Sequence, residues 1–110
     1  GLMVAVYLAT MGPEGIKSVA EICYHRAHFL ASELNKTNNF KLLSSNFFNE
    51  FIMKSKAKPF EINELLLKNN IEGGIDVSKI NENRIMFAVT ELNSPETLNK
   101  TIELLGGNFD

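Results

Sequence analysis

The chain has 110 residues, of which 45% are hydrophobic and 22% are charged, and its formal net charge at pH 7 is −2. A typical domain has ~150 residues, so this length fits one soluble domain over residues 1–110, and the apolar content excludes an intrinsically disordered chain. The slight acidity disfavours a nucleic-acid partner, because such proteins normally present a basic face.

Cys23 is the single cysteine, which excludes an internal disulfide and a four-thiolate zinc site and favours a reduced intracellular compartment, the cytoplasm. The apolar run 2–9 is far shorter than the ~20 residues that span a bilayer, and no basic residue precedes it, so we expect neither a membrane anchor nor a signal peptide. The chain starts at Gly1 directly in apolar sequence and stops soon after Gly106 and Gly107, which indicates a fragment of a larger protein.

Two consecutive helices are predicted in the first third of the chain. Residues 2–11 are apolar on nearly every side, which is typical of a helix packed between other elements, and Gly12 ends this stretch. Pro13 suits the first turn of a new helix, where its missing N–H costs nothing, and Glu14 favours the positive end of the helix dipole.

The second helix carries the strongest periodic signal in the sequence. Apolar residues recur at three- and four-residue steps and so share one face: Ile16, Val19, Ala20, Cys23, Ala27, Leu30, Ala31 and Leu34. Ile22 and Phe29 form a second stripe well away from that face, which predicts a second contact surface. The polar residues 35–39 end the helix and begin a loop.

Two short strands are predicted next, over residues 40–43 and 47–53. Alternation along the second strand places four residues on one face, Phe47, Asn49, Phe51 and Met53, and three on the other, Phe48, Glu50 and Ile52. Both faces are mostly apolar, so this strand is expected inside a sheet or covered on both sides.

Pro59 then opens a short helix with Ile62, Leu65 and Leu66 on one face, and Asn69 or Asn70 can cap its end. Residues 71–76 read as a strand interrupted by two glycines, which indicates a bulge or the close approach of another backbone.

The last part of the chain predicts one more strand and one more helix. Residues 84–90 alternate Ile85, Phe87 and Val89 against Met86 and Ala88. Ser94 and Pro95 supply the N-cap and first turn of a helix whose inner side carries Leu98, Ile102 and Leu105. The whole order predicts an α+β fold in which helices cover a mainly antiparallel sheet.

Few residues have the spacing of a catalytic or metal site. Cys23, His25 and His28 fall within six residues, but on a helix Cys23 points into the apolar face and His25 points almost opposite. We therefore expect a buried, unreactive Cys23, a solvated His25 and a His28 that is hydrogen-bonded at an edge, with no metal.

Three polar residues are weak candidates for binding a substrate. Asn49 and Glu50 interrupt an aromatic run, and a buried one would need a hydrogen-bonding partner or a ligand; an edge facing solvent explains them equally well. Arg84 could bind a carboxylate through its guanidinium fork, or could be a solvated strand end. The Gly73–Gly74 pair lacks the further glycine and the Gly-Lys-Ser/Thr ending of a phosphate loop.

Several separated stretches, taken in order, resemble a known family. They are Tyr7–Gly15, Ala27–Ala31, Phe47–Phe51, Ile71–Asp76 and Val89–Glu91. Together they are similar to the C-terminal part of glycine dehydrogenase (decarboxylating) subunit 1, from the two-subunit form of the glycine cleavage system P-protein. The resemblance runs over nearly the whole chain.

The resemblance implies the small C-terminal domain of a pyridoxal-phosphate aminotransferase-type enzyme of fold type I. The family decarboxylates glycine with pyridoxal phosphate and transfers the aminomethyl group to the lipoyl arm of H-protein. The resemblance also implies that subunit 2 holds the cofactor. None of the nine lysines in this sequence sits in a motif like that of the cofactor lysine. No catalytic or cofactor-binding residue is therefore assigned, and the expected partners are the rest of subunit 1, subunit 2 and H-protein.

Two alternatives from other classes remain open. One is a free-standing α+β binding or regulatory module without catalysis. The other is a metal-binding domain that uses Cys23, His25 and His28.

Overall fold

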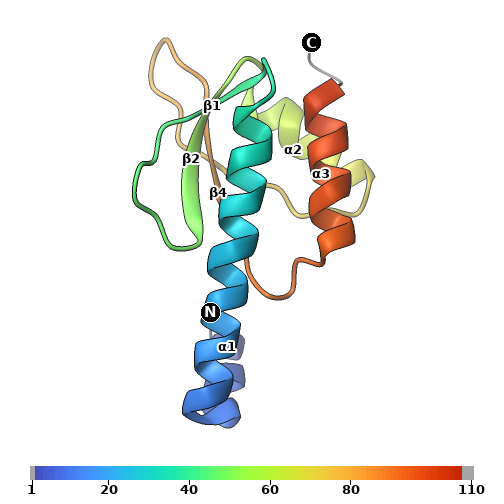
Figure 1. Cartoon of the computed structure of the whole chain (residues 1–110). Coiled ribbons are helices and arrows are strands. Elements are labelled where there is room, and N and C mark those ends of the chain that lie inside the picture. The colour runs from blue at the N-terminus through green and yellow to red at the C-terminus, as the bar shows by residue number, and fades with distance from the viewer. Residues whose placement is uncertain (1, 108–110) are drawn as a thin grey trace.

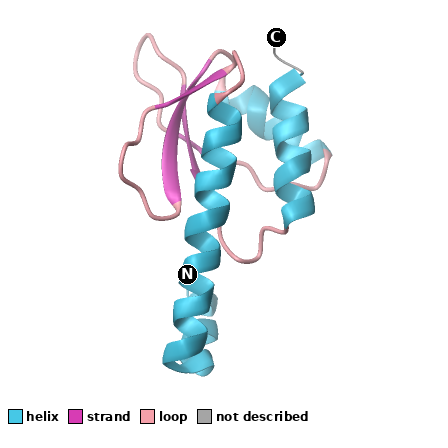
Figure 2. Cartoon of the chain, viewed as in Figure 1, coloured by secondary structure: helices cyan, strands magenta, loops and turns pink. Residues whose placement is uncertain are grey.

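A computed structural model describes the backbone of residues 2–107 and the side chains of residues 12–107. Over these residues the elements are α1 (Leu2–Asn35), β1 (Phe40–Leu42), β2 (Glu50–Ser55), α2 (Pro59–Lys68), β3 (Ile75–Asp76), β4 (Arg84–Ala88) and α3 (Pro95–Gly107). The helices lie together on one side of the sheet (Figures 1 and 2), which confirms the predicted α+β fold. In the described region, no helix has both the length and the apolar content that crossing a membrane requires.

The sheet has the strand order β1-β2-β4-β3, and each neighbouring pair is antiparallel. β2 therefore lies inside the sheet, as its apolar character predicted. One face of β2 is buried and carries Phe51, Met53 and Ser55, whereas Glu50 and Lys54 on the other face are exposed. The expectation that both faces are mostly apolar is wrong, because Lys54 and Glu50 flank Ile52 on the face away from the helices.

The second strand begins three residues later than predicted, at Glu50 instead of Phe47, and it continues to Ser55. The ring of Phe47 stacks on His28 of α1, with ring centroids 4.0 Å apart, and its carbonyl oxygen lies 2.8 Å from His28 Nε2. These contacts with a helix turn Phe47 out of the strand direction. A tertiary contact has thus overridden a local β pattern.

The predicted strand over residues 71–76 is also mostly wrong, because only Ile75 and Asp76 pair with β4. Residues 71–74 instead form an extended loop that packs against α2, and no bulge forms within the ladder. The close approach of another backbone was predicted correctly, since a Cβ atom at Gly74 would lie 2.6 Å from the carbonyl oxygen of Met86.

α1 is interrupted at Gly12, whose φ of 75° and ψ of 174° are not helical. Positive φ costs glycine nothing, so the break falls where the sequence predicted it. The side chains of residues 2–11 lie outside the described part, and the burial predicted for them is therefore untested. Figure 1 shows that the beginning of α1 extends past the sheet and α3. Ile16, four residues after Gly12, is exposed, which corrects its assignment to the core face.

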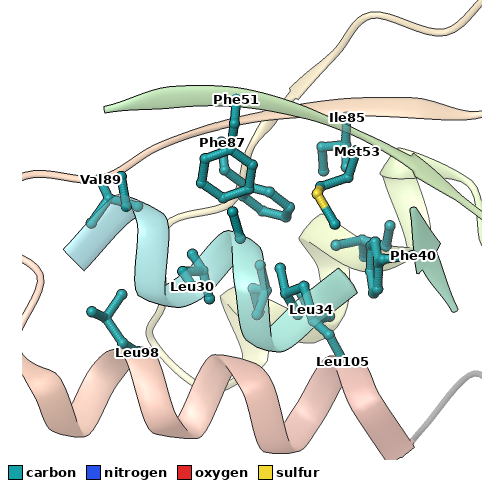
Figure 3. Packing of buried hydrophobic residues seen from close by; sticks show 14 of the residues in the cluster. Leu30, Leu34, Phe40, Phe51, Met53, Ile85, Phe87, Val89, Leu98 and Leu105 are labelled. Carbon is teal, nitrogen blue, oxygen red and sulfur yellow. The ribbon is translucent and has the colours of Figure 1, made fainter. Parts of the chain in front are cut away.

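The core lies between the sheet, α1 and α3. From above, Phe51, Phe87 and Met53 project from the strands toward Leu30 and Leu34 of α1 (Figure 3). α3 closes the other side of α1 with three buried residues, Leu98, Thr101 and Leu105. The predicted periodic face of α1 is confirmed for Val19, Cys23, Ala27, Leu30, Ala31 and Leu34.

The predicted helix ends are also confirmed. Ser94 caps α3, since its Oγ accepts a hydrogen bond from the N–H of Thr97 at 3.1 Å. At the end of α2, the N–H of Asn69 donates to the carbonyl oxygen of Leu66 and the N–H of Asn70 donates to that of Leu67, both at 3.0 Å. Asn70 takes a left-handed φ of 60°.

Asn39 is a buried polar residue that joins two ends of the fold. Its Nδ2 donates to the carbonyl oxygen of Leu105 at 3.0 Å and to that of Gly106 at 3.3 Å. These carbonyls belong to the last turn of α3, and the carbonyls of the last turn of a helix generally lack a donor within that helix. Asn39 therefore ties the end of α3 to the start of β1.

We expect Asn39→Ala to lower the free energy of unfolding by about 1–3 kcal/mol, because it leaves buried helix-end carbonyls without a donor. Urea denaturation followed by circular dichroism measures this loss. Asn38→Ala is the matched control, since Asn38 is exposed and next to it in the chain. Equal stability of the two variants would contradict the anchoring role of Asn39.

Candidate functional site

A hollow of about 350 Å³ opens where β4 ends and the 71–74 loop passes it. Its lining comes from three separate parts of the chain: Glu50, Glu72, Gly73, Gly74, Ile75, Met86, Ala88, Thr90, Leu92 and Asn93. Three of the stretches singled out in the sequence, Phe47–Phe51, Ile71–Asp76 and Val89–Glu91, therefore meet here.

The 71–74 loop is held by one amide side chain of α2. Asn63 Nδ2 donates to the carbonyl oxygen of Gly74, and the N–H of Gly74 donates to Asn63 Oδ1, both at 2.9 Å. A Cβ atom at Gly73 would lie 2.0 Å from Asn63 Oδ1. The two glycines are therefore needed because the loop passes between Asn63 on one side and β4 on the other.

The opposite wall is a turn over residues 90–93. The N–H of Thr90 donates to Asn93 Oδ1 at 2.8 Å, and the N–H of Asn93 donates to the carbonyl oxygen of Thr90 at 3.1 Å. Arg26 of α1 reaches this turn, where its Nη1 donates to the carbonyl oxygens of Glu91 at 2.9 Å and Asn93 at 2.6 Å. α1 thus fixes the wall from behind.

Two of the three predicted binding candidates lie at this end of the sheet. Glu50 is exposed and lines the hollow. Asn49 is half-buried and bonds to Val89 of the same chain. Its side-chain Nδ2 donates to the carbonyl oxygen of Val89 at 3.2 Å, and its main-chain carbonyl oxygen accepts a hydrogen bond from the N–H of Val89 at 2.9 Å. Asn49 therefore closes the ladder between β2 and β4.

Arg84 lies at the other end of β4, about 13 Å from Ala88 at ~3.3 Å per strand residue. Its Nε donates to the carboxylate of Glu82, which also lies 3.5 Å from Lys54 Nζ. The Arg84 guanidinium holds the pKa of the Glu82 carboxyl below its usual range. The structure thus separates Arg84 from Asn49 and Glu50, and the role of all three in binding stays a prediction.

Cys23, His25 and His28 do not converge. Cys23 is buried and its Sγ donates to Glu91 Oε2 at 3.3 Å, whereas His25 is exposed. His28 is hydrogen-bonded to Phe47 at the edge of the core, as expected. Among the described residues, no three His, Cys, Asp or Glu side chains lie close enough together to hold a metal ion.

The hollow suits a cationic or neutral polar group. Its ionisable side chains are the carboxylates of Glu50 and Glu72, and the rest of the lining is apolar or neutral. Two carboxylates repel an anion and attract an ammonium or guanidinium group.

Sequence reasoning missed Asn63 and Arg26, which hold the two walls. Asn63 gave a faint signal, as a polar residue between Ile62 and Leu65 on a helix facing the core. Arg26 gave none, because its acceptors are main-chain carbonyls more than sixty residues away, at Glu91 and Asn93.

Comparison with protein families matches residues 1–105 to the family described as glycine cleavage system P-protein. A curated relative from Thermomicrobium roseum, named probable glycine dehydrogenase (decarboxylating) subunit 1, is 34% identical over 108 residues. The match covers 94% of this chain and 24% of that relative. Other relatives with the same name are 30–39% identical. The chain therefore spans about a quarter of the curated relatives it matches.

Two solved structures are similar to the fold. A crystal structure of the glycine decarboxylase (P-protein) of the glycine cleavage system, in an inhibitor-bound form, is 33% identical with a TM-score of 0.79, over 96% of this chain and 24% of that one. A C-DES mutant with glycine covalently linked to its PLP cofactor is 14% identical with a TM-score of 0.68, over 83% and 24%. The second likeness shows the fold alone.

We expect Gly74→Ala to destabilise the protein by about 1–3 kcal/mol, because its new methyl group would meet the carbonyl oxygen of Met86. Gly107→Ala is the matched control, since in the described part of the chain no atom outside its chain neighbours and its own helix backbone lies within 4 Å of a methyl group there. Thermal unfolding of both variants measures the difference. If Gly74→Ala unfolds at the same temperature as Gly107→Ala, the loop does not pass as close to the Met86 carbonyl oxygen of β4 as the structure has it.

We expect the Cys23 thiol to be alkylated more slowly at pH 8 in the native chain than in urea. Burial raises the pKa of the Cys23 thiol, and the hydrogen bond to the Glu91 carboxylate raises it further, so less thiolate is present. The unfolded thiol ionises first, so the free energy of unfolding should fall as the pH rises above about 8.5. Mass spectrometry of iodoacetamide-treated protein measures the alkylation rate of Cys23 in each state. Equal rates in the native chain and in urea would contradict the expected protection of the thiol.

Proposed function

Since the chain belongs to the glycine cleavage system P-protein family, we propose that residues 1–110 are the C-terminal small domain of subunit 1 of glycine dehydrogenase (decarboxylating). In this proposal the complete cytoplasmic enzyme decarboxylates glycine and passes the aminomethyl group to the lipoyl arm of H-protein. The domain's part is to pack on the rest of subunit 1 and to help position the assembled site with subunit 2.

The observation that carries the proposal is the extent of the match. The P-protein crystal structure superposes on 96% of this chain, yet this chain covers only 24% of that protein. A compact unit that recurs inside a much longer protein supports the proposal that the chain is a domain of such a protein. In our proposal the domain contributes contacts and orientation to the active site of the larger enzyme.

In this proposal pyridoxal phosphate supplies the electron-accepting ring of the complete enzyme, and subunit 2 holds it. The hollow described above does not fit that cofactor. Its ionisable groups, Glu50 and Glu72, are carboxylates that would repel a phosphate, and none of its lining residues is a lysine. We therefore assign no cofactor ligand to the hollow and route no chemical step through it.

Support for a packing role comes from α1. Ile22 and Phe29, which the sequence set apart from the core face, are indeed exposed. They lie on α1, on a side of the helix that is turned away from the core, where a neighbouring element could cover them. In our proposal this stripe meets the rest of subunit 1 or subunit 2.

The test is glycine-dependent bicarbonate exchange with H-protein, using complete subunit 1 co-expressed with subunit 2. Deletion of the segment matching residues 1–110 should abolish assembly or activity. The double variant Ile22→Asp, Phe29→Asp should weaken assembly by about tenfold or more, since it places charges in an apolar contact. Size-exclusion chromatography measures assembly.

Ser32→Asp is the control, because it adds a carboxylate, one where the double variant adds two, at an exposed position of α1. Full exchange activity without the segment would refute the proposal and favour a free-standing binding module. Unchanged assembly of the double variant would show that Ile22 and Phe29 do not lie in the interface.

A further inference from the structure

The four strands present a second face, which none of the described helices covers. We call it the outer sheet face. It consists of the strand residues that alternate with the buried ones: Lys41, Glu50, Ile52, Lys54, Ile75, Arg84, Met86 and Ala88. α1, α2 and α3 contribute to a core on the opposite side (Figure 1).

The strand register arranges an apolar row across the outer sheet face. Met86 lies opposite Ile52 in one neighbouring strand and opposite Ile75 in the other. Leu43 extends the row, because its N–H donates to the carbonyl oxygen of Ile52 at 2.9 Å. Ile75 is 60% exposed and Leu43 is 38% exposed. The face of an antiparallel sheet that meets water normally carries polar residues in these positions.

A basic row borders the apolar row on one side. Lys41 lies opposite Lys54, and Lys54 lies opposite Arg84. Like charges that face each other across strands destabilise a sheet. Glu82 contacts Lys54 and Arg84. The row thus has three cations and one contacting carboxylate, and an excess of positive charge remains.

The other side of the apolar row is acidic. Glu50 lies one strand position beyond Phe51, opposite Ala88, and Glu72 shares the hollow with it. The outer sheet face therefore runs from basic through apolar to acidic. A partner that fits it needs an apolar strip with acidic groups on one side and a basic group that enters the hollow on the other.

The length of the relatives indicates what covers this face. Each curated relative carries about three quarters of its chain beyond the part that this sequence matches. A surface joined to its partner by the same chain meets it at an effective concentration of ~1 mM or more, which favours that partner over a separate one. Domains of one chain also pack through mixed polar and apolar surfaces of this kind.

From the register and the charges we infer that the outer sheet face is the docking surface for the remaining part of the same subunit. The apolar row is covered, the basic row pairs with carboxylates, and the Glu50–Glu72 hollow receives a lysine or arginine side chain. This inference rests on the proposed place of the chain in subunit 1. It names a face on the sheet that is separate from the Ile22 and Phe29 stripe of α1.

The test uses cysteine accessibility in complete subunit 1. Ile75→Cys reports on the outer sheet face, and Leu67→Cys is the matched control on α2, because the two positions are 60% and 73% exposed in the domain. Leu43→Cys is a second reporter at the other end of the apolar row. A short pulse of maleimide followed by peptide mass spectrometry gives each rate, and buried Cys23 is an internal slow reference.

We expect both reporters to react at least about tenfold more slowly than Leu67→Cys in subunit 1 alone, and all three to react alike in urea. Fast labelling of both reporters in native subunit 1 would overturn the inference. So would protection that appears only after subunit 2 is added, or protection that is lost on dilution, which would indicate a second copy. The labelling rates do not depend on exchange activity. Failure of this inference is therefore distinguishable from failure of the proposed function.

Discussion

The position of α1 between the sheet and α3 is the constraint on which the other features depend. A helix enclosed on two sides must be apolar over a wide arc, and it must carry small side chains where its neighbours come close. Ala27 and Ala31 are fully buried there, while Leu30 and Leu34 fill the space toward the aromatic side chains of β2 and β4 (Figure 3). Because α1 and the other described helices lie on one face of the sheet, they leave the opposite face uncovered.

Apolar packing determines which faces meet, and a few polar side chains determine where the segments end. Asn39 ties the end of α3 to β1, Asn63 holds the Gly73–Gly74 loop, and Arg26 holds the 90–93 turn. In each case a side-chain donor reaches main-chain carbonyls at the end of a helix, in a turn or in a loop. The two walls of the hollow are thus positioned from α1 and α2, so changes in these helices would be transmitted to it.

The outer sheet face and the exposed stripe of α1 differ in character. The stripe is apolar and lies on a helix that projects from the body of the domain, whereas the outer sheet face has an ordered sequence of basic, apolar and acidic rows. An ordered charge pattern specifies orientation as well as contact. If the domain packs in a larger subunit, as we propose, the sheet would set its orientation there and α1 would extend to a further neighbour.

Sequence alone determined the element order, the break at Gly12, the caps at Ser94 and Asn69, and the buried face of α1 from Val19 to Leu34. These features depend on interactions within a few residues, namely helical spacing, capping and the backbone freedom of glycine. The tertiary structure decided the start of β2 and the path of residues 71–74, and it separated Arg84 from Asn49 and Glu50. Those outcomes depend on partners distant in the chain, His28 for Phe47 and Asn63 for Gly74, and local patterns carry no information about such partners because only folding brings them together.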